Sequence, residues 1–205
     1  MTPTRTASLQ DAHDIANVMT GWVHRDVGEW DQLGALFHPD AQIKLSWFTG
    51  PATDFVAASA RMARSDLRTK HVIATPSIRF SRSGLRAVTE TNAIVVVENR
   101  HVPLGAVGHS RFFDRVECRD GRWAIVERTA IYDFSSFTFP LGPVVSIDAA
   151  AVSRYPIEYA ALAYVLDLGG FPVGDTFATK DGDDEREMKR CAAQWLDDVD
   201  VAADR

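Results

Sequence analysis

The chain has 205 residues, of which 46% are apolar and 24% are charged, a composition typical of globular proteins rather than of disordered, fibrous or disulfide-rich ones. At this length about 70% of the surface of the unfolded chain can be buried, so the core requires no disulfide or structural metal. The net charge of −6, without a concentrated basic face, argues against a nucleic-acid partner.

Cysteine usage and hydropathy indicate the compartment. Cys118 and Cys191 lie far apart and lack a CxxC or Cys/His metal spacing, which is typical of free thiols in a reducing environment. No apolar run approaches the ~20 residues of a membrane span, and the N-terminal residues lack the apolar region of a signal peptide. We therefore expect a cytoplasmic protein with no membrane partner.

The first third of the chain predicts helices. Ser8 and Asp11 have the spacing of a capping box, and apolar residues then recur at helical spacing until Gly28. The resulting elements are helices over about 8–26, 30–37 and 51–63, with a strand at 41–48 before the third helix.

From Lys70 onward the apolar period changes from helical to two. The Asp120-Gly121 pair is the strongest hairpin signal in the sequence. Helices followed by antiparallel strands indicate an α+β order rather than a βαβ one. Four strands are expected, at 71–82, 85–99, 107–119 and 122–134.

The last third of the chain returns to helical patterning. Helical runs are expected at about 148–168, where Pro156 interrupts, and at 185–199. We expect residues 1–137 to form one α+β domain and residues 138–205 to form a helical extension that packs on it or on a partner subunit.

The sequence carries none of the common catalytic motifs: it has no Walker loop, GxGxxG, GxSxG or HExxH. No two of its six histidines are spaced i, i+4 on an expected helix, so nothing in the pattern supports a metal site.

A few polar side chains nevertheless stand within apolar elements. Asp26 closes the first helix and His71 opens a strand, while Ser110, Arg128 and Tyr132 lie within later strands. Residues i, i+2 and i+4 of a strand share a face, so Arg128 and Tyr132 point the same way. If these faces line an apolar hollow, their polar groups are candidates for a site.

Each of these residues also has a structural interpretation. Asp26 taken alone is a helix-end residue at the surface, and His71 is an ordinary strand histidine. Arg128 taken alone fits the outer, solvent-exposed face of a sheet. Ser110 taken alone says little about whether a site is present.

Together these residues resemble a known family. The segments 26–41, 67–71 and 120–123, which read DVGEWDQLGALFHPDA, LRTKH and DGRW, resemble the SnoaL-like branch of the nuclear transport factor 2-like superfamily. Within it they are most similar to the scytalone dehydratase and lindane dehydrochlorinase families, over about residues 8–137. The resemblance implies a cone-shaped, curved antiparallel sheet with N-terminal helices, also described as a cystatin-like roll, in addition to the C-terminal helical extension.

The resemblance also implies roles. It pairs an aspartate at Asp26 with a histidine at His71, places Arg128 where the dehydrochlorinase pocket has an arginine, and places Ser110 at the pocket serine of the dehydratase. This chain departs from the dehydratase elsewhere. Val96 or a neighbour replaces its second histidine, Phe112 its pocket asparagine, and Arg25 and about Leu45 its two tyrosines.

These residues predict a cofactor-independent lyase or isomerase. An imidazole oriented by a carboxylate is a suitable general base near neutral pH, so we assign His71 as the base and Asp26 as its orienting partner. Arg128 would stabilise the negative charge that develops, and Tyr132 and Ser110 would add hydrogen bonds. The expected ligand is a small hydrophobic or polycyclic molecule, and the expected walls are Trp47, Phe48, Met62, Val96, Phe112 and Phe134.

A second interpretation is that the chain is a SnoaL-like protein without catalytic activity, which binds a small molecule or is purely structural. The family commonly forms homodimers or homotrimers, so the extension either covers the mouth of the cone or packs on a second subunit. The residues expected in that contact are Tyr155, Tyr159, Leu162, Tyr164 and Leu168.

Overall fold

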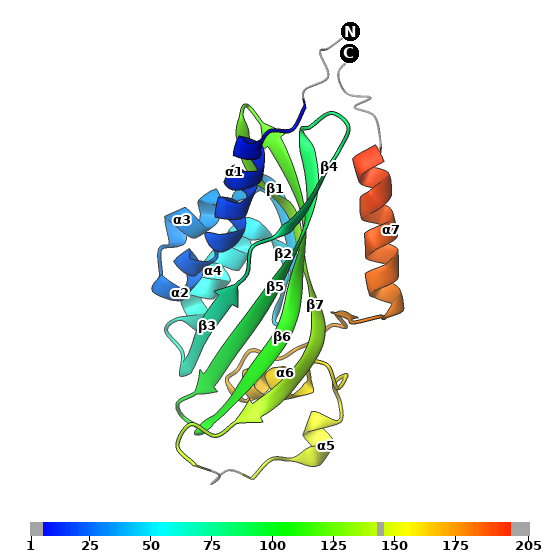
Figure 1. Cartoon of the computed structure of the whole chain (residues 1–205). Helices are drawn as coiled ribbons and strands as arrows, with labels where there is room; N and C mark the ends of the chain where they lie inside the picture. The colour runs from blue at the N-terminus through cyan, green and yellow to red at the C-terminus, as the bar shows by residue number, and fades with distance from the viewer. Residues whose placement is uncertain (1–5, 143–145, 198–205) are drawn as a thin grey trace.

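The computed structural model describes residues 6–142 and 146–197, in which an eight-stranded curved sheet is flanked by helices. Helices α1 to α4 lie on one side of the sheet, α7 lies on the other side, and α6 lies near one end (Figure 1). The predicted α+β fold with N-terminal helices is thereby confirmed. No helix of the described ranges has the length and apolar run needed to cross a membrane.

The N-terminal helix begins with the predicted capping box. The Ser8 hydroxyl oxygen accepts from the Asp11 backbone N–H at 3.2 Å, and the Asp11 carboxylate accepts from the Ser8 backbone N–H at 2.8 Å. These two bonds satisfy backbone donors that the first turn would otherwise leave unpaired. The helix, α1, spans Leu9–Thr20.

The single helix predicted over residues 8–26 is in fact two. A Cβ atom at Gly21 would lie 2.6 Å from Leu36 Cδ2, so any larger residue there requires the Leu36 side chain to move. The chain turns at this glycine and resumes as α2, Val23–Val27, which ends at Gly28 with a φ of +79°. This turn directs the end of α2 toward the sheet.

Two further helices and the first hairpin follow. The strand predicted at 41–48 starts earlier and ends at Leu45, and a second short strand pairs with it antiparallel. The elements are α3 (Trp30–Ala35), β1 (Phe37–Leu45), β2 (Phe48–Pro51) and α4 (Ala52–Met62).

The strand predicted at 71–82 is divided in two, and both parts pair with the same neighbour. Pro76 lies between them and has no N–H to donate to a ladder. The long strands occur as predicted; the strand predicted at 85–99 begins one residue later, and the other two extend beyond their predicted bounds, to 104–119 and 122–138. The elements are β3 (Leu67–Ile73), β4 (Ser77–Phe80), β5 (Arg86–Asn99), β6 (Leu104–Arg119) and β7 (Arg122–Thr138).

The sheet has the main order β2-β1-β7-β6-β5-β3. Most pairs are antiparallel, but β1 pairs with β7 in parallel, so the sheet is mixed rather than wholly antiparallel as predicted. Register shifts between β6 and β7 fall at His109/Ser110 and at Arg115/Val116. Such bulges bend and twist a strand, and the resulting curvature gives the sheet a concave face.

The C-terminal extension packs on both sides of this sheet. Residues 160–166 of α6 are buried on every side of the helix, which packs against β6 and β7. Residues 143–145 and 198–205 of the predicted extension lie outside the described residues. Its elements are α5 (Ala149–Val152), α6 (Ala160–Leu168), β8 (Ala178–Thr179), which pairs with β7 in parallel, and α7 (Asp183–Asp197).

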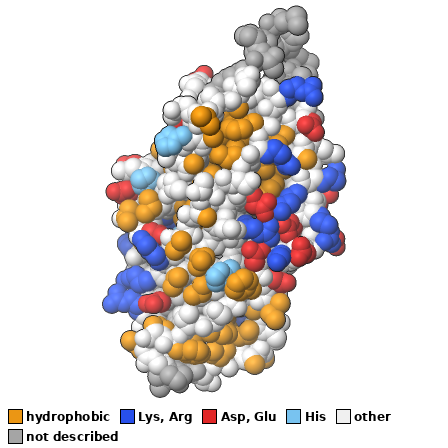
Figure 2. Space-filling view, viewed as in Figure 1, with side chains coloured by type: hydrophobic (Ala, Val, Ile, Leu, Met, Phe, Trp, Pro, Cys, Tyr) orange, Lys and Arg blue, Asp and Glu red, His pale blue; other side chains and the backbone are white. Residues whose placement is uncertain are grey.

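Helix α7 is held on the outer face of the sheet by apolar and ionic contacts. Its Ala192 and Leu196 join a buried cluster with outward-facing residues of the strands. Arg111 of β6 donates to Glu185 of α7 at 2.6 Å and also to Glu90 and Asp133 of the sheet. Acidic and basic side chains are intermingled beside α7 in Figure 2.

Replacing Arg111 with methionine should separate α7 from the sheet. The change removes the arginine partner of the buried Glu185, which keeps its ion pair with Lys189 at 2.8 Å, so we expect a loss of about 1–3 kcal/mol of unfolding free energy. Urea unfolding measures the loss. The matched control is Arg190→Met, whose ion pair with Glu187 lies on the exposed face of α7, and equal stabilities of the two variants would contradict the role of Arg111.

Candidate active site

The end of α2 is joined to His71, near the end of β3, by one carboxylate. Asp26 Oδ1 lies 2.7 Å from His71 Nδ1, and Asp26 Oδ2 accepts from the His71 backbone N–H at 2.7 Å. The carboxylate side chain is 1% exposed and the imidazole 10%. Because an ionised carboxylate only accepts hydrogen bonds, the ring proton belongs on Nδ1 and Nε2 is left as an acceptor.

Burial and neighbouring charges set the protonation of this pair. Burial lowers the pKa of His71 below 6.5, and the charges of Arg25 and Arg128 act in the same direction, while the hydrogen bond to Asp26 opposes them. Burial alone would raise the pKa of Asp26, but its bonds to His71 and the Arg25 charge keep the pKa below 3.8. The dyad at neutral pH is therefore an imidazole beside a carboxylate.

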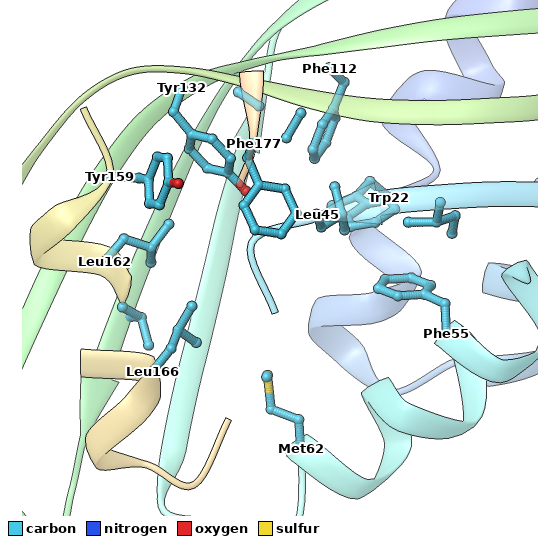
Figure 3. Close-up of a cluster of buried hydrophobic side chains, with 14 of the residues drawn as sticks. Trp22, Leu45, Phe55, Met62, Phe112, Tyr132, Tyr159, Leu162, Leu166 and Phe177 are labelled. Carbon is cyan, nitrogen blue, oxygen red and sulfur yellow. The ribbon is translucent and has the colours of Figure 1, made fainter. Parts of the chain in front are cut away.

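Next to His71 the concave face of the sheet encloses a narrow cavity of about 40 Å³. Five neighbouring strands and three helices supply its walls, and Figure 3 shows side chains from α4, α6 and the sheet converging on one another. The lining residues are Trp22, Arg25, Leu45, Ser46, Trp47, Met62, Thr69, His71, Val95, Val97, Ser110, Phe112, Ala130, Tyr132, Leu162 and Leu166.

Strand register explains why the polar residues meet there. Ala93 pairs with Ser110, which pairs with Tyr132, and His71 pairs with Val95 two residues along β5. All of these positions share one face because side chains alternate along a strand. The predicted site residues His71, Ser110 and Tyr132 are thus brought to one cavity.

The hydroxyl groups differ in what they offer to a ligand. The Ser110 hydroxyl donates to the Ala93 carbonyl at 3.2 Å, so its proton is engaged. The Tyr132 oxygen accepts from the Ser46 backbone N–H at 2.8 Å, which leaves the phenol proton to donate. Burial raises the pKa of Tyr132 to about 12, so this donor persists at neutral pH.

Arg128 occupies a different place from the one expected. Its guanidinium binds both oxygens of Asp114, at 2.7 and 3.0 Å, and its face lies against the rings of Trp22 and Phe112. The side chain is 0% exposed and does not line the cavity. It lies one layer behind the aromatic wall with its charge already paired, so its position does not support the expected contact with substrate.

The expected wall residues divide into two groups. Trp47, Met62 and Phe112 line the cavity. The other three do not: Phe48 packs against Trp47 and Phe55, Phe134 is 56% exposed and stacks on His109, and Val96 alternates with the lining residues Val95 and Val97.

The sequence marks Arg25 only as a departure from the family pattern, leaves open whether Leu162 covers the cone or a second subunit, and gives no role to Leu166, although all three line the cavity. Arg25 follows Trp22 by three positions, which places both on one helix face. This spacing could have predicted that Arg25 lies beside Trp22 at the cavity. Leu162 and Leu166 are i, i+4 neighbours in an apolar helix, but no sequence pattern states which surface that helix covers. No cluster of three or more metal-ligating side chains is found among the described residues.

Comparison with known proteins gives a matching family and matching folds. Residues 7–129 match the family described as the SnoaL-like domain. The chain is 29% identical over 179 residues to an uncharacterized protein of Aspergillus terreus, a match that covers 77% of this chain and 65% of the relative. The chain thus spans just under two thirds of that relative's length.

Two similar solved structures come from Novosphingobium species. One, from N. aromaticivorans, is of the scytalone dehydratase type, with a TM-score of 0.54, 17% identity, and coverage of 68% of this chain and 97% of the other. The second is a hexachlorocyclohexane dehydrochlorinase from N. barchaimii, with a TM-score of 0.56, 13% identity, and coverage of 67% and 97%. At these identities the likeness concerns the fold.

Titration of His71 tests the electrostatics of the site. We expect an imidazole pKa below 6.5 by NMR, and a lower one in Asp26→Asn, because that change removes the hydrogen bond that raises it.

A depressed histidine pKa also means that, as the pH falls, the unfolded chain takes up the proton before the folded chain does. The stability this group contributes is therefore present above pH 6.5 and lost as the pH falls through the folded pKa. An imidazole pKa above 6.5 would contradict this description.

Proposed function

Because the chain belongs to the SnoaL-like family, we propose that it is a cofactor-independent lyase or isomerase in which His71 removes a carbon-bound proton from a small hydrophobic substrate. The observation that carries this proposal is the Asp26–His71 contact at the wall of a mostly apolar cavity. Such a dyad needs no metal or organic cofactor to act as a base.

The position of His71 supports this step. No residue of the described chain bonds His71 Nε2, and the ring lines the cavity, so this nitrogen is available to a substrate C–H. As the proton arrives, Asp26 stabilises the imidazolium through the 2.7 Å hydrogen bond to Nδ1, which is largely shielded from solvent. The carbon-bound electron pair then forms a double bond, either with loss of a leaving group or with migration of the proton.

The walls restrict the substrate to a small apolar molecule. Aromatic and aliphatic side chains form most of the lining, and Tyr132 supplies a hydroxyl donor. Dehydration and dehydrochlorination, the reactions in the names of the two similar structures, both involve loss of a carbon-bound proton. These reactions are consistent with the proposed base.

Proton exchange tests the proposal without knowledge of the natural substrate. With 2-tetralone, 2-indanone and cyclohexenone in D₂O, the protein should speed deuterium incorporation beside the carbonyl, measured by NMR. His71→Gln should lose about 10²–10⁴-fold of that acceleration, and Asp26→Asn a smaller part. The matched control is His13→Gln, a histidine on the exposed side of α1, which should keep the full rate.

The same experiment separates catalysis from simple binding. Ketones that bind, as seen by perturbed NMR signals of the cavity residues, but exchange at equal rates in wild type and both dyad variants would contradict the proposed enzyme. That result would favour a SnoaL-like binding protein.

A further inference from the structure

One permanent charge borders the cavity among the residues described as lining it, and it belongs to Arg25, the residue before the carboxylate of the dyad. Arg25 is 7% exposed, and its guanidinium lies over the Trp47 ring at 5.5 Å from the ring centre. Burial lowers the pKa of Arg25 to about 10, with the Asp26 charge opposing, so the side chain stays charged at neutral pH.

This guanidinium is poorly paired for so buried a group. One terminal nitrogen donates to Thr69 Oγ1 at 2.8 Å and the other contacts the Met62 sulfur, a weak acceptor, at 3.2 Å. Within the described residues its Nε has no hydrogen-bond partner. The nearest Asp26 oxygen is 3.9 Å away, beyond hydrogen-bond distance, and both carboxylate oxygens bond His71.

The two buried arginines near the cavity are therefore not equivalent. Arg128 has its charge matched by two bonds to Asp114 and is separated from the cavity by Trp22 and Phe112. Each arginine has one nitrogen without a hydrogen-bond partner among the described residues, Nε in Arg25 and Nη1 in Arg128, but of the two Arg25 alone lines the cavity. Buried N–H donors without acceptors are costly unless a ligand supplies the acceptor.

Charge balance restricts what that ligand is. With His71 neutral, the charges of Arg25 and Asp26 cancel, and those of Arg128 and Asp114 cancel as well. A substrate that is already a carboxylate would bring an uncompensated negative charge into a buried site. A neutral substrate whose proton moves to His71 creates one anion and one imidazolium, and the site remains balanced.

We propose that Arg25 holds the oxygen on which negative charge develops, and that the cavity selects neutral molecules with an acidic C–H beside a carbonyl group. The proposal rests on the proposed role of His71 as the base. In the step, the C–H bond breaks and the proton bonds to His71 Nε2. The freed electron pair forms a carbon–carbon double bond, the carbonyl π pair moves onto oxygen, and the resulting enolate oxygen accepts from Arg25.

A phenol that ionises on binding tests this without turnover. 4-Nitrophenol is neutral in acidic solution and gains a distinct absorption band as the phenolate. At a pH where the free phenol is mostly neutral, wild-type protein should produce the phenolate band, because the proton passes to His71 and the oxygen lies at Arg25. 4-Nitroanisole, which has no proton to lose, is the neutral companion ligand.

The variants isolate the charge of Arg25. Arg25→Gln retains a donor for Thr69 and should weaken phenolate binding about 10- to 100-fold, while 4-nitroanisole binding is unchanged. Arg25→Lys, which keeps the charge, should recover part of the loss. Arg61→Gln, on the exposed side of α4, is the matched control and should behave as wild type.

Three results would overturn the proposal. They are failure of the wild type to bind the phenol or to ionise it, an equal loss of 4-nitroanisole binding in Arg25→Gln, and tighter wild-type binding of 4-nitrobenzoate than of the phenol. Phenolate formation in wild type that depends on Arg25, together with ketone exchange that does not depend on His71, would instead remove the proposed base and leave the anion site.

Discussion

The candidate site depends on the two hydrogen bonds that Asp26 accepts from His71. One fixes the ring and its tautomer, and the other joins the end of α2 to the backbone of β3. A carboxylate that is 1% exposed is costly to bury unless it is bonded in this way. The same contact therefore stabilises the fold and leaves His71 Nε2 available at the cavity wall.

The fold could be predicted from the sequence as far as local patterns specify it. Periodicity located the helices and long strands, and the Asp120-Gly121 pair located the β6–β7 hairpin. The parallel pairing of β1 with β7 joins segments about eighty residues apart, and no local pattern encodes it. For the same reason the separate positions of α6 and α7, on the concave and outer faces of the sheet, were left open by the sequence.

The site could be predicted where alternation is regular. Ser110 and Tyr132 line the cavity, as their strand positions indicate. Val96 lies between the lining residues Val95 and Val97, so its side chain points to the opposite face of the sheet. Alternation failed at Phe134, because the bulge at His109/Ser110 changes the register of β7 before that residue. Arg25 was considered only as a departure from a family pattern, although its spacing from Trp22 places it on the same helix face.

The tautomer of His71 tests this account most directly. In ¹⁵N NMR spectra of the imidazole at neutral pH, the account predicts a protonated Nδ1, with its proton in slow exchange and shifted downfield by the Asp26 carboxylate, and an unprotonated Nε2. A ring protonated on Nε2, or one that interconverts rapidly between the two forms as in free imidazole, would show that Asp26 does not orient the base.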